Sequence, residues 1–307
     1  MSTSSWIILG IYAGAALLAS LAGGSLPSLV RLTHTRMQTA ISFIGGLMLG
    51  MALLHLIPHA AAETHSLDRA VAWALGGFLV MFFLQRVFHY HQHGVPGDAA
   101  SGSAHADCCG HAHPIPAQPE SAPAMGRRIS WMAVALGMAF HSLIDGLALA
   151  AAVMAESSSG VGLVGLGTAL AVILHKPFDA LAVLTLMHSS GCRPGARRLM
   201  NGVMALVAPL GVALALLGLG EVAESNHLVL GCALGFCGGG FLCIACSDLL
   251  PELHFHSHDR LRLSLALLAG LGVSILVGAF EGHGHDHDHE NSEVHPHAQH
   301  AANPTRP

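Results

Sequence analysis

The chain has 307 residues, of which 10% are charged and 52% are hydrophobic, and its mean hydropathy is +0.57. A soluble domain carries about a quarter charged residues, so this composition excludes an ordinary soluble or disordered protein. The apolar runs do not alternate with polar residues, as the strands of a membrane β-barrel do. With a formal net charge of −5 and no basic stripe, we expect no nucleic-acid partner. The composition predicts an all-α polytopic protein embedded in a lipid bilayer.

Eight apolar stretches approach the roughly 20 residues that a helix needs to cross a bilayer. They cover about residues 6–22, 40–58, 68–88, 129–155, 160–187, 199–219, 227–250 and 261–280. The predicted order is helices 1–3 over residues 1–88, a loop over 89–128, helices 4–8 over 129–280 and a tail over 281–307. Loop and tail are rich in His and poor in apolar residues, which predicts flexible segments that bind metal ions loosely.

The basic residues predict how the helices are oriented. Ten of the 13 lie on one side of the predicted membrane: Arg31, Arg36, Arg86, Arg127, Arg128, Arg193, Arg197, Arg198, Arg260 and Arg262. The positive-inside rule places that side in the cytoplasm, together with the loop over 89–128, and both termini outside. The few charges and short loops favour a bacterial inner membrane.

A short motif occurs twice in successive predicted helices. Residues 141–148 read HSLIDGLA and residues 175–182 read HKPFDALA. A second pair joins helices 2 and 7, where HLIPH at 55–59 matches DLLPE at 248–252. Because successive helices cross the membrane in opposite directions, these matches predict inverted repeats, which are typical of transporters with a substrate site near the midplane.

The first pair of motifs carries groups that can bind a metal ion. Residues four apart share a helix face, so His141 points the same way as Asp145, and His175 the same way as Asp179. Ionisable groups at this depth are costly and usually functional. Two imidazoles and two carboxylates form a donor set that suits Zn²⁺ and similar divalent ions. The alternative interpretation is a pair of His–Asp hydrogen bonds that hold helices together.

Polar residues at the ends of helices 2 and 7 predict a path to this site. With the predicted topology, His55 and His59 lie near the external face, where we expect them to accept ions. Asp248 and Glu252 lie near the cytoplasmic face, where we expect them to receive ions, and His254 continues this exit path.

These features resemble the ZIP family of divalent-metal transporters. HSLIDG and HKPFD are similar to the family's motifs in its fourth and fifth helices, and GGLML, HLIP and SDLLPE extend the resemblance over nearly the whole chain. It implies a ZIP-like bundle of eight helices, and a primary metal site of His141, Asp145, His175 and Asp179, with Met48 as a possible thioether ligand.

The chain departs from the family pattern at a neighbouring second metal site. Many relatives use the residue after each motif histidine, but this chain has Ser142 and Lys176 at those places, and LVAP at 206–209 of helix 6 has no carboxylate. We therefore expect one metal ion, with the Lys176 ammonium occupying the second cation's position beside Asp179.

The sequence thus predicts a transporter, not an enzyme, that imports Zn²⁺ into the cytoplasm by alternating access, with Fe²⁺, Mn²⁺ or Cd²⁺ as further candidate ions. One alternative is an intramembrane metal-dependent hydrolase, in which a catalytic zinc activates water. Another is an exporter of the cation diffusion facilitator type. The sequence leaves open whether the protein forms a homodimer.

Overall fold

The computed structural model describes residues 3–29, 34–89, 124–157, 164–255 and 260–282. Within these ranges the elements are α1 (Thr3–Leu29), α2 (His34–Met51), the π-helix η1 (Ala52–Leu56), α3 (Ile57–Thr64), α4 (Leu67–His89), α5 (Ala124–Glu156), α6 (Leu166–Ser189), α7 (Pro194–Ser225), α8 (His227–Phe255) and α9 (Arg260–Gly282). Most of the predicted loop and tail lies outside the described ranges.

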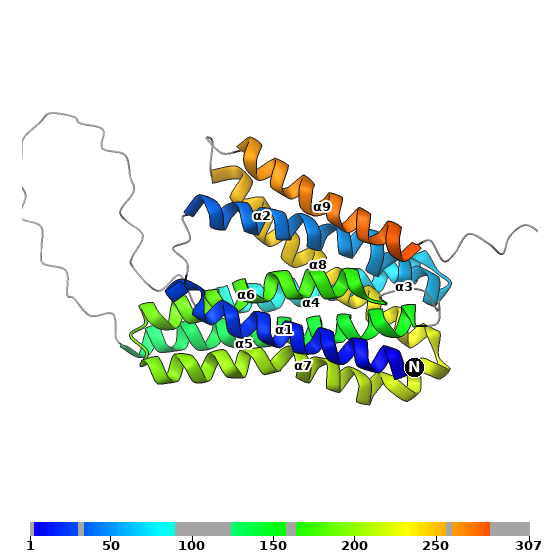
Figure 1. The fold of residues 1–307 in the computed structure, drawn as a ribbon, viewed down its shortest axis with the longest axis horizontal. Helices are drawn as coiled ribbons and strands as arrows, with labels where there is room; N and C mark the ends of the chain where they lie inside the picture. Colours follow the sequence, from blue (N-terminus) through cyan, green and yellow to red (C-terminus); the bar gives the residue numbers. More distant parts are fainter. Residues whose placement is uncertain (1–2, 30–33, 90–123, 158–163, 256–259, 283–307) are drawn as a thin grey trace, which may run out of the picture.

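The predicted all-α architecture is confirmed. In the described part of the chain, eight helical stretches are long and apolar enough to cross a membrane, and α2, η1 and α3 together form the second of them. Figure 1 shows α2 and α9 together on one side of the bundle and α1, α5 and α7 together on the other. In the most apolar membrane-length segment of α5, 72% is buried inside the protein, whereas in that of α9 only 17% is buried. Helix α5 is therefore central in the bundle and α9 is peripheral.

The packing of the helices follows the inverted repeat. Helix α1 packs on α6 while α7 packs on α5, and α4 packs on α8 while α9 packs on α2. The repeat relates the first three spans to the last three, and α5 to α6. This exchange converts the contact of α1 with α6 into that of α7 with α5, and the contact of α4 with α8 into that of α9 with α2. The symmetry that the sequence motifs predict is therefore present in the contacts between helices.

Close glycine contacts show the same symmetry residue by residue. At four glycines an added Cβ would strike a backbone carbonyl of the neighbouring helix: Gly46 at Leu267, Gly239 at Ala74, Gly77 at Phe236 and Gly270 at Phe43. An offset of 193 residues carries Gly46 to Gly239 and Ala74 to Leu267, and it relates the other two contacts in the same way. The same offset carries His55 to Asp248. Glycine at these positions lets the helix backbones touch.

A third glycine pair lies beside the two HxxxD motifs. Gly23 of α1 packs on the Pro177 carbonyl of α6, and Gly211 of α7 packs on the Leu143 carbonyl of α5. Pro177 and Leu143 hold the same place in the two motifs, two residues after the histidine. The outer helices α1 and α7 therefore support the two motif helices in equivalent ways.

These contacts predict opposite effects for two adjacent glycines of α4. Gly77→Ala places a methyl group against the Phe236 carbonyl, and such overpacking costs about 1–3 kcal/mol. Gly76 faces open space, so Gly76→Ala is expected to be neutral or to stabilise the helix by up to about 1 kcal/mol. Thermal unfolding of the purified variants in detergent measures the difference. Equal melting temperatures for the two variants would contradict the close contact between α4 and α8.

Candidate metal site

The two HxxxD motifs meet at the contact between α5 and α6. His141 and Asp145 come from α5, and His175 and Asp179 come from α6. One ligand atom from each residue can be chosen so that all four lie within 4.8 Å of one another. Asp145 is fully buried, and the side chain of Asp179 is 17% exposed. We call these four residues the donor cluster.

The distances within the donor cluster fit a tetrahedral metal ion. The Nε2 atom of His175 lies 3.2 Å from Asp145 Oδ2 and 3.7 Å from Asp179 Oδ2. The Nε2 atom of His141 lies 3.4 Å from each of the same two oxygens. A tetrahedral zinc site with bonds of about 2.0–2.1 Å has edges of roughly 3.3–3.4 Å. The four nitrogen–oxygen distances, 3.2–3.7 Å, are thus close to those of a tetrahedral zinc site.

The α6 backbone orients the His175 ring for metal binding. Its Nδ1 atom lies 2.7 Å from the Ala171 carbonyl oxygen, which can only accept a hydrogen bond. Nδ1 therefore donates to this carbonyl, so Nε2, which faces the two carboxylates, is the nitrogen left to bind a metal ion. A second interaction that fixes the tautomer in this way is common at metal-ligating histidines.

Lys176 provides a positive charge within the same site. Its side chain is 1% exposed, and Nζ donates to Asp145 Oδ2, to Asp179 Oδ2 at 3.1 Å and to Ser142 Oγ at 2.9 Å. The two carboxylates and the one ammonium carry a formal charge of −1 between them, which favours a cation. Since Nζ contacts the oxygens that face the imidazoles, a metal ion bound there must share or displace the lysine.

Close packing next to the cluster restricts the space for another side chain. A Cβ on Gly146, which follows Asp145, would strike the Ala208 carbonyl of α7. At this level α7 thus contributes backbone and small side chains to the contact with α5. This packing agrees with the lack of a carboxylate at 206–209.

Two predicted residues of the second span lie outside the donor cluster. Met48 is buried in the hydrophobic core cluster that also contains Ile144 and Phe241. His55 lies in the π-helix η1, a form often found at functional sites, and its Nε2 lies 2.9 Å from the Ser274 carbonyl of α9. The ring packs where Gly278 has no side chain. The His55 ring is thus held by α9.

The end of the bundle where α5 terminates contains a residue that sequence reasoning missed. The Glu156 side chain is 12% exposed, and one of its oxygens lies 4.0 Å from Nε2 of His59. Its other oxygen accepts a hydrogen bond of 2.6 Å from the Gly165 amide. The sequence signal that could have identified Glu156 is an acidic residue at the C-terminal end of an apolar helix. The side chains of Asp248, Glu252 and His254 lie outside the described part of α8.

In the described part of the chain, eight membrane-length helical stretches surround a buried cluster of His and Asp side chains that could hold a metal ion, which is the arrangement of an integral membrane protein of metal-ion transport type. The chain belongs to the ZIP zinc transporter family, whose model matches residues 6–278. The predicted family is confirmed. The family consists of transporters, and the comparisons support neither the hydrolase nor the exporter alternative.

Individual relatives are zinc transporters. The chain is 28% identical over 268 residues to zinc transporter ZIP4 of Mus musculus, covering 72% of this chain and 39% of that protein. It is 27% identical over 236 residues to zinc transporter ZIP13 of Rattus norvegicus, covering 71% of this chain and 63% of that protein. A 138-residue match to ZIP9 of Micropogonias undulatus is 32% identical, with 44% and 42% covered. The chain thus spans less than two thirds of these relatives.

Proposed function

We propose that this protein carries Zn²⁺ across the membrane through one midplane site, formed by His141, Asp145, His175 and Asp179. The observation that carries the proposal is the convergence of two imidazole nitrogens and two carboxylate oxygens at tetrahedral spacing. Family membership and the zinc-transporting relatives give zinc priority over Fe²⁺, Mn²⁺ and Cd²⁺, which similar ligands also bind. Met48 is proposed as an additional thioether ligand.

Lys176 is proposed to replace a second metal ion. Its ammonium contacts both carboxylates and Ser142. The resemblance to the family implies that this is the position of the second cation in many relatives. When zinc binds, its charge repels the ammonium from the shared oxygens. When zinc leaves, the ammonium returns and balances the buried carboxylates. The lysine thereby lowers the free energy of the metal-free site, in which two carboxylates are buried, and favours release of the ion.

The proposed path runs inward past the donor cluster. His55 and His59 serve entry from outside, and Asp248, Glu252 and His254 serve exit into the cytoplasm. The position of Glu156 near His59 supports an entrance at that end of the bundle. The distribution of arginines supports external termini and a cytoplasmic loop between α4 and α5. The inward direction is proposed from the resemblance to the ZIP family, and the bacterial inner membrane from the few charges and short loops.

Alternating access is the proposed mechanism. The inverted repeat gives two equivalent halves around a fixed site, so that relative motion of the halves opens one side at a time. Helices α5 and α6 carry all four members of the donor cluster and are expected to move together. A homodimer is compatible with this mechanism, because each chain contains its own cluster.

Zinc uptake into proteoliposomes tests the proposal. We expect saturable uptake of radioactive zinc by the wild-type chain, and its loss after His175→Ala combined with Asp179→Ala. His65→Ala combined with Asp68→Ala is the matched control, because both residues are exposed, His65 at the end of α3 and Asp68 in the first turn of α4. The proposal fails if the cluster variant transports as fast as the control variant.

A further inference from the structure

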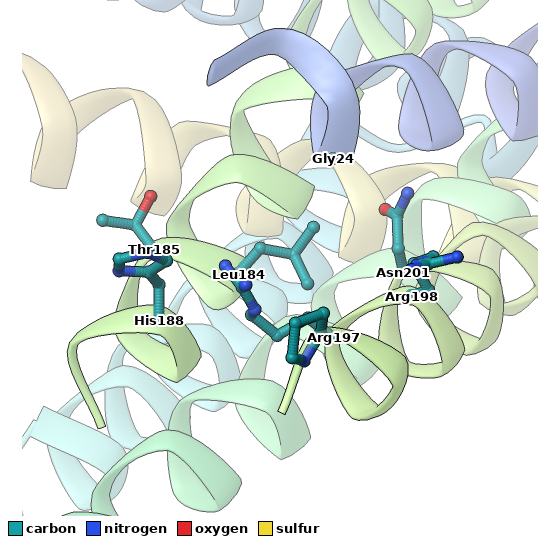
Figure 2. A pocket seen from close by; sticks show the side chains of 8 residues that line it. Gly24, Leu184, Thr185, His188, Arg197, Arg198 and Asn201 are labelled. Carbon is teal, nitrogen blue, oxygen red and sulfur yellow. The ribbon is translucent and has the colours of Figure 1, made fainter. Parts of the chain in front are cut away.

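A basic cavity lies away from the donor cluster, between the ends of three helices. It has a volume of about 550 Å³ and opens between α1, the last turns of α6 and the first turns of α7. Figure 2 shows Thr185 and His188 of α6 on one side, Arg198 and Asn201 of α7 on the other, and Gly24 of α1 above. Arg197 lies between the two sides.

The charge of this cavity is one-sided. Three of its lining residues are basic, namely His188, Arg197 and Arg198, and none of the described lining residues is acidic. Helix α7 begins at Pro194 without a side-chain cap, so its positive dipole end adds to the same potential. A divalent cation is not expected to bind here, whereas an anion is.

Two buried polar atoms of the cavity wall lack partners within the described part of the chain. They are Nε of Arg197, a donor, and Oδ1 of Asn201, an acceptor. The Asn201 amide is oriented by its other end, where Nδ2 donates to the Leu21 carbonyl at 3.1 Å. Gly24 makes this approach possible, because a Cβ there would strike the Asn201 amide. Both atoms are covered by the chain itself, so a ligand in the cavity meets the lining guanidinium groups of Arg197 and Arg198 instead.

We propose that this cavity binds a phosphate ester, with glycerol phosphate as the model chemistry. Arginine forks match phosphate oxygens, and Arg197 and Arg198 supply two of them to this cavity. The cavity lies at the ends of membrane-spanning helices, at the depth of lipid headgroups, so an anionic phospholipid and a soluble phosphate ester are both possible sources. The ligand holds α1, α6 and α7 together. This binding does not depend on the proposed zinc transport.

The test compares lipid and soluble ligands on the purified full-length chain. Thermal unfolding and native mass spectrometry are recorded with phosphatidylglycerol, with phosphatidylcholine as the neutral control, and with soluble glycerol 3-phosphate. We expect saturable binding and a raised melting temperature with phosphatidylglycerol or glycerol 3-phosphate. An effect of phosphatidylglycerol alone identifies a lipid headgroup as the source, and an effect of glycerol 3-phosphate as well identifies a soluble ester. Absence of both effects would overturn the proposal.

Matched variants distinguish binding inside the cavity from general electrostatic attraction to the arginines. Arg197→Gln with Arg198→Gln is expected to weaken binding at least tenfold, whereas Arg193→Gln, which removes an exposed arginine outside the cavity lining, keeps it. Thr185→Phe fills the cavity and leaves every charge in place, so it should also abolish binding. Equal losses in Arg193→Gln and the double variant, or full binding by Thr185→Phe, would overturn the proposal.

Discussion

Replacing Asp145 by asparagine is expected to abolish zinc uptake and to destabilise the protein. Asp145 is fully buried, and its Oδ2 atom faces both imidazoles and the Lys176 ammonium. Asparagine keeps the shape but removes the charge, and removing one partner of a buried ion pair costs about 3–5 kcal/mol. Uptake by proteoliposomes and thermal unfolding in detergent measure the two effects.

A second substitution separates the role in transport from the role in folding. Adding Lys176→Met to Asp145→Asn removes the poorly paired ammonium, so we expect most of the stability to return while uptake stays absent. The matched control is Asp68→Asn, which neutralises an exposed carboxylate in the first turn of α4. Uptake above half of the wild-type rate in Asp145→Asn would show that this carboxylate is not a ligand of the transported ion.

Lys176→Met alone is expected to tighten zinc binding and to slow transport. Two unit charges 4 Å apart interact by roughly 4 kcal/mol at an effective dielectric constant of 20, so loss of the ammonium raises the affinity by about tenfold or more. Tighter binding retards release, and the maximal uptake rate falls. Titration against a zinc chelator measures the affinity, with the His175→Ala, Asp179→Ala chain as the blank for the histidine-rich segments. Unchanged or weaker binding, or two ions in the wild-type cluster, would contradict the single-ion account.

The fold was predictable because membrane helices leave strong signals in sequence. Long apolar runs with few charges define the spans, and the helical period places His141 with Asp145 and His175 with Asp179. The inverted motifs predicted that α5 and α6 are equivalent. The meeting of their polar faces then follows, since buried ionisable groups need partners. The constant offset between glycine contacts extends this symmetry to spans where the sequence motifs are short.

The details that were missed depend on tertiary contacts. Helical periodicity does not predict the π-helix at Ala52–Leu56, which changes the direction of the residues around it, including His55. Lys176 was expected beside Asp179, and only the packing of α5 on α6 brings its ammonium to Asp145 and Ser142 as well. Glu156 is joined to His59 and Gly165 through contacts across α5, α3 and the start of α6, which no local pattern indicates.

Locating zinc in crystals of the purified protein by anomalous diffraction tests the central claim most directly. The account predicts one zinc peak within the donor cluster, about 2.0–2.2 Å from the Nε2 atoms of His141 and His175 and from carboxylate oxygens of Asp145 and Asp179. This peak should vanish in the His175→Ala, Asp179→Ala variant. A wild-type crystal with zinc elsewhere and none between α5 and α6 would contradict the assignment of the transport site.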